Sequence, residues 1–156
     1  MPDLLVPLYR LPDTACLTET LARQDIHIRP ALAPEKHLIE AFAKESFSAA
    51  WASEVAVSFG RTPASCIIAI KGGRPIGFAC YDAIKLNFFG PTGVLPEYRK
   101  LGIGKALLVY TLTIQKLAGY AYAIIGAAGP VEFYAKAVNA IPIADSEPGI
   151  YGDMLR

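Results

Sequence analysis

The sequence predicts an α/β (α+β) domain in which helices flank a mixed β-sheet. Three observations lead to this prediction. Short apolar stretches with strand character recur along the chain, helical periodicity returns between them, and glycine or proline stands at many of the junctions. The hydrophobic fraction of 53%, compared with 19% charged residues, further predicts that the chain folds compactly.

The N-terminal half is expected to contribute two single strands, three helices and a β-hairpin. Leu17 and Leu21 are spaced one helical turn apart, and apolar residues recur at helical spacing after Pro34. Gly72 and Gly73 supply the turn of the hairpin. In chain order, the elements are placed at residues 4–8 (strand), around 17–21 (helix), 26–30 (strand), 34–47 and 51–59 (helices), and 65–71 with 75–81 (hairpin).

The C-terminal half is expected to alternate strands with helices. The stretch 102–117 is apolar on nearly every face, which predicts a deeply buried helix that ends at Gly119. The run 120–125 is continuously apolar, as in an inner strand covered on both faces. The expected order is a strand at 86–95, a helix at 102–117, a strand at 120–125, a helix from 129 to 137, and closing strands at 140–143 and 150–155.

The expected strand at 86–95 is irregular. Gly90, Pro91 and Gly93 interrupt it, and a regular central strand disfavours both residue types. Pro91 has no N–H to donate to a neighbouring strand. A bulge, or a splayed and partly unpaired strand, accommodates such residues, and we expect one of the two here.

Composition excludes several classes of protein. The length of 156 residues fits a single domain, and the formal net charge of +1 provides no basic field for nucleic-acid binding. Any bound anion must therefore be held by local geometry. No secretion signal and no apolar run of the ~18 residues needed to span a bilayer is present, so we expect a cytoplasmic protein without membrane contact.

The three cysteines give no pattern of metal ligation. Cys16, Cys66 and Cys80 are odd in number and lack the spacing of a metal site, so we expect free, buried thiols in a reducing compartment. Neither Cys66 nor Cys80 has a histidine nearby in sequence to activate it as a nucleophile. No metal is expected.

The segment that carries chemistry runs from Val94 to Ala106. A strand ends, the chain turns, and Gly102 and Gly104 stand where a helix begins. Glycine lets the backbone approach a ligand closely, and the free N–H groups of a helix start attract anions. This arrangement is suited to hold a pyrophosphate, with added positive charge from Arg99, Lys100 and Lys105.

Two familiar phosphate-binding patterns do not fit these glycines. A P-loop requires Ser or Thr after the lysine, where Ala106 stands. A dinucleotide-binding fingerprint requires a third small residue at Leu107 and an acidic residue near Ile124, and neither is present. A third pattern, Arg-x-x-Gly-x-Gly after a strand that ends in Val-x-Pro, matches directly.

With that third pattern, the chain resembles the GCN5-related N-acetyltransferase (GNAT) superfamily over roughly residues 26–155, most densely at 93–117. The resemblance implies a GNAT-like mixed, mostly antiparallel sheet with a splayed central strand pair, flanked by helices. It implies a single N-acetyltransferase domain over residues 1–156, with 26–156 as the core and 1–25 as an extension packed on it. Gly90, Pro91 and Gly93 are then the residues that open the wedge for the pantetheine arm.

The resemblance also implies roles for individual residues. The Val94 backbone would face the thioester carbonyl of acetyl-CoA, and Tyr134 would protonate the departing thiolate. Backbone amides would hold the pyrophosphate along the run Lys100, Leu101, Gly102, Ile103, Gly104 and Lys105, with Arg99 beside it. The family often places an asparagine near the end of the inner strand, whereas Gly126-Ala127-Ala128 offers only backbone at that place.

The group that deprotonates the acceptor stays open. Glu45, Glu54 and Asp82 are candidates, and a base acting through water is equally open. His27 and His37 are isolated. Phe47, Trp51 and Phe88 are candidates for the walls of the acceptor pocket, although packing in the core accounts for Trp51 equally well.

The predicted function is direct transfer of an acetyl group from acetyl-CoA, as co-substrate, to a primary amine. The expected acceptor is a small, partly apolar molecule and not a nucleic acid or a membrane, and a homodimer is one open form of assembly. The alternative from another class is a non-catalytic acyl-CoA-binding sensor or regulatory module, which needs the glycines but not Tyr134. A transferase for a longer acyl chain or a protein N-terminus is a further alternative.

Overall fold

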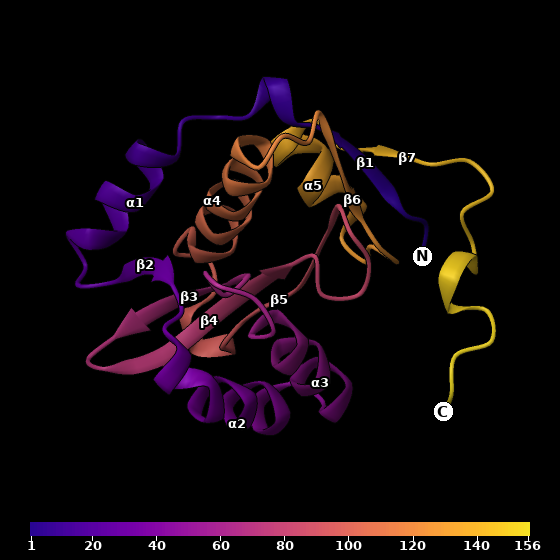
Figure 1. The fold of residues 1–156 in the computed structure, drawn as a ribbon. Helices are drawn as coiled ribbons and strands as arrows, with labels where there is room; N and C mark the ends of the chain where they lie inside the picture. The colour runs from indigo at the N-terminus through magenta and orange to yellow at the C-terminus, as the bar shows by residue number, and fades with distance from the viewer.

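The computed structural model describes residues 1–156 and contains a seven-stranded sheet in the order β2-β3-β4-β5-β6-β1-β7 (Figure 1). The strands are β1 (Leu4–Pro7), β2 (His27–Pro30), β3 (Cys66–Lys71), β4 (Arg74–Tyr81), β5 (Phe88–Val94), β6 (Tyr122–Ile125) and β7 (Ile141–Pro142). All neighbouring pairs are antiparallel except β5 and β6, which run parallel. The predicted mixed, mostly antiparallel sheet is confirmed.

Five α-helices cover the sheet: α1 (Thr14–Ala22), α2 (Lys36–Ser46), α3 (Ala49–Ser58), α4 (Ile103–Leu117) and α5 (Val131–Val138). Short 3-10 turns occupy Leu8–Arg10, Ala33–Glu35, Pro96–Tyr98 and Gly149–Tyr151. Helices α2 and α3 lie against one face of the sheet, and α1 and α4 lie against the other (Figure 1). None of the helices combines the length and the apolar character needed to cross a membrane.

The alternation of strand residues divides the core between the two faces. Ile67 and Ala69 of β3 join the larger cluster around α4, whereas Cys66 and Ile68 join the smaller cluster under α2 and α3. Helix α4 is buried along most of its length, as its apolar sequence predicts. Burial on this scale fixes α4, and therefore its N-terminus, firmly against the sheet.

The parallel pair β5–β6 is splayed. Only Phe88 and Phe89 of β5 pair with β6, opposite Ile124 and Ile125. Beyond them β5 continues along β4 as far as Val94, so the two strands part where the glycines and the proline interrupt β5. The irregular strand predicted from Gly90, Pro91 and Gly93 is thus the strand at which the sheet opens.

The C-terminal edge of the sheet differs from the sequence prediction. Residues 150–155 form no strand: a 3-10 turn at Gly149–Tyr151 is followed by irregular chain, and Leu155 is 96% exposed. Pro148, Gly149 and Gly152 explain this, because proline and glycine interrupt regular pairing. The strand expected at 140–143 is reduced to Ile141–Pro142.

The N-terminal strand lies near that edge of the sheet. In the structure β1 lies between β6 and β7, with Leu5 opposite both Ile124 and Ile141. The segment 1–25, expected as an extension packed on the core, therefore supplies a strand within the sheet. The strand β6 is also less enclosed than expected, since Tyr122 is 42% exposed.

Candidate acyl-transfer site

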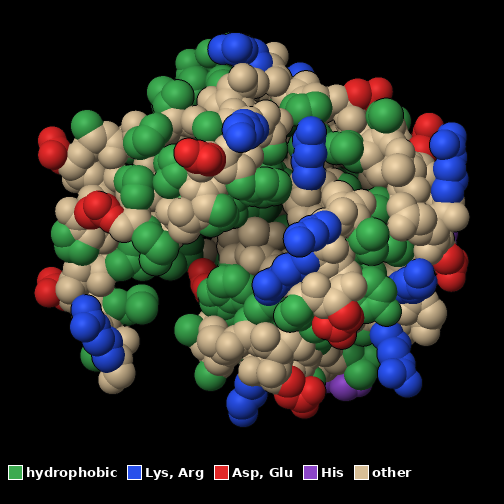
Figure 2. Space-filling model, turned by 180° about the vertical axis from the view of Figure 1, so that it is seen from behind, with side chains coloured by type: hydrophobic (Ala, Val, Ile, Leu, Met, Phe, Trp, Pro, Cys, Tyr) green, Lys and Arg blue, Asp and Glu red, His purple; other side chains and the backbone are tan.

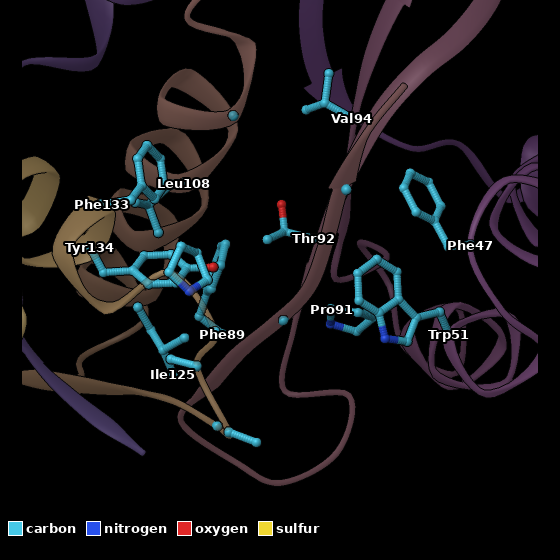
Figure 3. Close-up of a pocket in the computed structure, with 18 of the residues that line it drawn as sticks. Phe47, Trp51, Phe89, Pro91, Thr92, Val94, Leu108, Ile125, Phe133 and Tyr134 are labelled. Carbon is cyan, nitrogen blue, oxygen red and sulfur yellow. The ribbon is translucent and has the colours of Figure 1, made fainter. Parts of the chain in front are cut away.

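A cleft of about 1230 Å³ opens where β5 and β6 part. Its walls come from α3, from β5, from the start of α4, and from the loop between β6 and α5 (Figure 3). The C-terminal residues Tyr151 and Met154 also line it. The cleft therefore joins segments from both halves of the chain at the gap in the sheet.

Free backbone amides form one end of this cleft. The amides from Lys100 to Lys105 donate no hydrogen bond within the chain, and the first amide bonded in the turn of α4 is that of Ala106, which donates to Gly102. No side chain caps the helix. A run of unpaired N–H groups at a helix N-terminus is an anion site, because the donors and the helix dipole act together.

Two glycines keep this end accessible. Gly102 has a φ of +88°, a left-handed conformation that favours glycine, and a β-carbon there would meet no atom within 4 Å. A β-carbon at Gly104 would lie 4.0 Å from Val94 Cγ2 and otherwise face open space. The backbone of the turn is thus bare toward the cleft, as expected for close approach of a phosphate.

Positive charge accompanies the amides. Arg99, Lys100 and Lys105 line the cleft, and Figure 2 shows lysine and arginine side chains beside a hollow bordered by hydrophobic ones. The side chain of Leu101 does not line the cleft and is exposed to solvent. Among the residues predicted for cofactor binding, Leu101 therefore brings only its backbone.

The backbone of Val94 points into the gap between β5 and β6. Leu95 donates its N–H to Ile76 on β4 at 2.9 Å. Because bonded and non-bonded pairs alternate in an antiparallel ladder, the preceding pair, Val94 opposite Gly77, directs its N–H and C=O away from β4. The Arg99 Nε–H donates to the Val94 carbonyl at 3.1 Å, which leaves the Val94 N–H as a donor facing the cleft.

Tyr134 lies on the opposite wall, on α5. It is 7% exposed and packs edge-on against Phe133 with ring centroids 5.2 Å apart. Figure 3 shows its ring reaching from α5 toward the cavity, across from Thr92 and Val94 of β5. Burial raises the pKa of Tyr134 to about 12, so its hydroxyl is a proton-bearing hydrogen-bond donor at neutral pH.

Aromatic side chains from β5 and from the segment at the start of α3 line another part of the cleft. Phe47, Trp51 and Phe88 all line the cleft, as predicted, and the rings of Phe47 and Trp51 lie 5.2 Å apart. The Phe47 ring presses against the strand itself, because a β-carbon at Gly93 would lie 2.6 Å from Phe47 Cζ. The absence of a side chain at Gly93 thus lets an aromatic wall reach the strand next to Val94.

The three candidate bases have different surroundings. Glu54 lines the cleft, and burial raises the pKa of its carboxyl group. Glu45 is exposed on α2 and lies outside the cleft. Asp82 accepts hydrogen bonds from Arg61, at 3.1 Å, and from the Asn87 amide, at 2.7 Å, which gives it a structural role in a turn. Only Glu54 is placed to act on a molecule in the cleft.

Other reactive side chains lie elsewhere. Cys66 and Cys80 are buried opposite each other on β3 and β4, outside the cleft, and the thiol of Cys80 has its pKa raised by the neighbouring Cys66 and by burial. Cys16 is exposed, contrary to the expectation that all three thiols are buried. His27 and His37 are exposed and do not line the cleft.

Sequence reasoning missed some lining residues. Tyr98 both packs on the core and lines the cleft. Tyr151 was not predicted at all, and its hydroxyl occupies the space at Gly126, where a β-carbon would lie 2.2 Å from it. The tyrosine is 25 positions from Gly126 in sequence, so only folding brings it to the end of β6. The only local signal was Gly126 itself, which stands where the family often has an asparagine and so leaves space for another side chain.

A splayed parallel strand pair, a bare amide turn before a buried helix and a donor aimed into the gap are features suited to acyl transfer from a pyrophosphate-bearing cofactor. The comparisons agree with this class. A model of the Acetyltransferase (GNAT) family matches residues 28–136. The chain belongs to the GNAT acetyltransferase family, as its resemblance predicted. A search of curated proteins found no match.

Solved structures with the same fold are distant in sequence. The glucosamine N-acetyltransferase region of a fungal multi-domain GH3 β-N-acetylglucosaminidase matches with a TM-score of 0.74 and 16% identity, over 91% of this chain and 19% of that one. A GCN5-related N-acetyltransferase from Sphaerobacter thermophilus matches with a TM-score of 0.66 and 16% identity, over 91% and 48%. This chain thus spans about half the length of that enzyme, or less for the fungal one.

A shorter match concerns a structure with the cofactor product bound. The GNAT family N-acetyltransferase YhbS from Escherichia coli, solved in complex with CoA, matches with a TM-score of 0.50 and 23% identity, over 62% of this chain and 59% of that one. At these identities the likeness concerns the fold.

Proposed function

We propose that this protein is an acetyl-CoA-dependent N-acetyltransferase that moves the acetyl group directly to a primary amine of a small molecule. The observation that carries the proposal is the run of six unpaired amides, Lys100 to Lys105, beside a gap that the Val94 N–H and Tyr134 both face. Membership of the GNAT family and the likeness to a relative solved with CoA support the choice of cofactor.

In the proposed complex, the pyrophosphate of acetyl-CoA accepts hydrogen bonds from the amides at the start of α4. Arg99, Lys100 and Lys105 add charge around it; the first two are exposed and Lys105 is half-buried, so each contributes modestly. The pantetheine arm enters the gap between β5 and β6. The thioester oxygen then accepts a hydrogen bond from the Val94 N–H, which stabilises the negative charge that develops there during attack.

The proton follows a balanced path. The amine must arrive uncharged at the thioester carbon, so an ammonium acceptor first loses a proton, and Glu54 is the carboxylate of the cleft that can accept it. The nitrogen attacks, the C–N bond forms, and the C–S bond breaks. The nitrogen releases its second proton, and the thiolate gains one to become CoA–SH, so the amide and CoA are the products.

Tyr134 is the proposed donor to the departing sulfur. Because its pKa of about 12 lies above that of a thiol, the phenol donates a hydrogen bond to the thiolate and passes on its proton only as another proton replaces it. This makes Tyr134 a weaker acid than an ordinary phenol. Its contribution then rests on stabilising the leaving group in the transition state.

The experiment is Tyr134→Phe, which removes the hydroxyl and keeps the packing of the ring. Turnover measured by free-thiol release with a panel of amines should fall by about 10²-fold, the scale for a positioned acid. Affinity for CoA, measured by calorimetry, should stay within a few-fold. Tyr120→Phe is the matched control, because Tyr120 packs on the core and does not line the cleft.

Two results would contradict parts of this proposal. Equal turnover in the wild type and the Tyr134→Phe variant would remove Tyr134 from the reaction and assign the proton to water. A wild-type protein that binds CoA but acetylates no amine of a broad panel would instead support the alternative of a CoA sensor.

A further inference from the structure

The charges in the cleft are unevenly distributed. Its cationic side chains, Arg99, Lys100 and Lys105, all belong to the turn before α4 and its first residues. Its only acidic side chain is Glu54, on α3 at the other wall. The end that faces away from the pyrophosphate site therefore offers one negative charge and no arginine or lysine.

Glu54 has no partner of its own. None of the ion pairs of the structure includes it, and its side chain is half-buried. Burial raises the pKa of this carboxyl group, and Glu54 in turn contributes, after burial and Asp3, to the raised pKa of Tyr151. A half-buried carboxylate without a counter-charge is stabilised by any cation that enters the cleft.

The surroundings of Glu54 are aromatic. Trp51 lies one helical turn before it on α3, so the two side chains share a face of the helix. Trp51 contacts Phe47, and Phe47 lies against Gly93, next to the Val94 N–H that faces the gap. A continuous apolar wall thus leads from the carboxylate to the strand where transfer would take place.

From these features, and resting on the proposed function, we propose that the acceptor is a small monoamine with an aromatic or similarly apolar body and no carboxylate or phosphate. Its ammonium end meets Glu54, and its body lies along Phe47 and Trp51. Glu54 both attracts the ammonium and repels an acidic group on the same molecule, which is how one charge discriminates between otherwise similar amines. The faces of the aromatic rings favour the cation further.

The test is a matched pair of acceptors that differ by one carboxylate. 2-Phenylethylamine and phenylalanine share the ring and the primary amine. With acetyl-CoA and free-thiol release, the wild type should show kcat/KM for 2-phenylethylamine at least about tenfold above that for phenylalanine. Spermidine, a polyamine without an apolar body, should also be the poorer acceptor.

Glu54→Gln separates recognition from proton transfer. If Glu54 recognises the acceptor, the variant lowers the ratio of kcat/KM for 2-phenylethylamine to kcat/KM for phenylalanine by about tenfold, because the repulsion between Glu54 and the carboxylate of phenylalanine is lost. If Glu54 acts only as a base, both rates fall together and the ratio stays constant. Glu45→Gln, on the exposed face of α2, is the control and should leave both rates unchanged. Binding of CoA by calorimetry shows that each variant is folded.

The outcomes are distinct. Equal or greater activity with phenylalanine, or an unchanged ratio in Glu54→Gln, overturns this inference and leaves the acetyltransferase proposal standing. Should Glu54→Gln fail to bind CoA, the wild-type ratio decides alone. The absence of turnover with every amine, while CoA still binds, overturns the proposed function and this inference with it.

Discussion

Gly104 lies in the first turn of α4, where the backbone faces the cleft and no atom of the chain fills the space of a side chain. The helix alone does not require glycine there, because its φ is not in the left-handed region and a β-carbon makes only ordinary contact with Val94. The space beside Gly104 is therefore open to the approach of a ligand. At this residue, stability and binding should respond in opposite directions to substitution.

Gly104→Ala should leave the free energy of unfolding unchanged or raise it by about 0.5–1 kcal/mol, since glycine costs conformational entropy within a helix. Gly104→Glu should lower CoA affinity strongly, because it adds both volume and negative charge at the anion site. Denaturant unfolding and calorimetry measure the two effects. If a folded Gly104→Glu protein bound CoA as the wild type does, the pyrophosphate site would lie elsewhere.

Among the elements, the contact between α4 and β4 positions the turn whose amides, from Lys100 to Lys105, are unpaired. A β-carbon at Gly77 of β4 would lie 3.1 Å from the Gly93 carbonyl oxygen, 3.2 Å from Leu107 Cδ1 and 3.3 Å from Val94 Cγ2. The missing side chain at Gly77 thus lets the helix lie close to the two strands that carry the site. Both the backbone of β5 and the core of α4 would have to move to make room.

Gly77→Ala should therefore destabilise the protein by about 1–3 kcal/mol, the usual cost of overpacking a filled core. It should also weaken CoA binding, since Val94 and the start of α4 shift with the helix. Gly129→Ala is the control, because a β-carbon there meets only Met1 Sδ at 3.7 Å. Urea unfolding measures both stabilities. Equal free energies of unfolding for Gly77→Ala and Gly129→Ala would contradict tight packing at Gly77.

Over the whole molecule, positive and negative charges nearly cancel. The 15 lysine and arginine residues nearly match the 14 aspartate and glutamate residues. Anion binding is therefore expected from the amides of one turn and not from a general positive field. The cations that line the cleft, Arg99, Lys100 and Lys105, are confined to one turn and the start of one helix and form no extended basic track.

We accordingly expect no tight binding of nucleic acid. Fluorescence polarisation of a labelled oligonucleotide, single- or double-stranded, should show no saturable change at micromolar protein and an ionic strength of about 0.15 M. Titration of CoA under the same conditions is the positive control. Tight binding that weakens steeply with added salt would contradict the prediction.

The sequence alone determined the features that contiguous residues encode. The irregular strand from Gly90, Pro91 and Gly93, the bare turn at Gly102 and Gly104, and the buried helix after it were all predicted from neighbouring residues. Their physical basis is local, because backbone freedom, the missing N–H of proline and the period of apolar residues act over a few positions. For that reason the conformation of the turn from Lys100 to Lys105 could be predicted from neighbouring residues, and its binding of an anion stays a prediction.

The tertiary structure decided what depends on distant segments. It placed Glu54, alone among three candidate acids, in the cleft, brought Tyr151 beside Gly126, and inserted β1 between β6 and β7, whereas the strand expected at 150–155 did not form. No local pattern encodes these choices, since each depends on which segments pair across the sheet and which surfaces they bury. At the acceptor end of the cleft, Phe47 and Trp51 were candidates from the sequence, but only the folded chain shows that the helix carrying Trp51 and Glu54 faces β5 across the cleft.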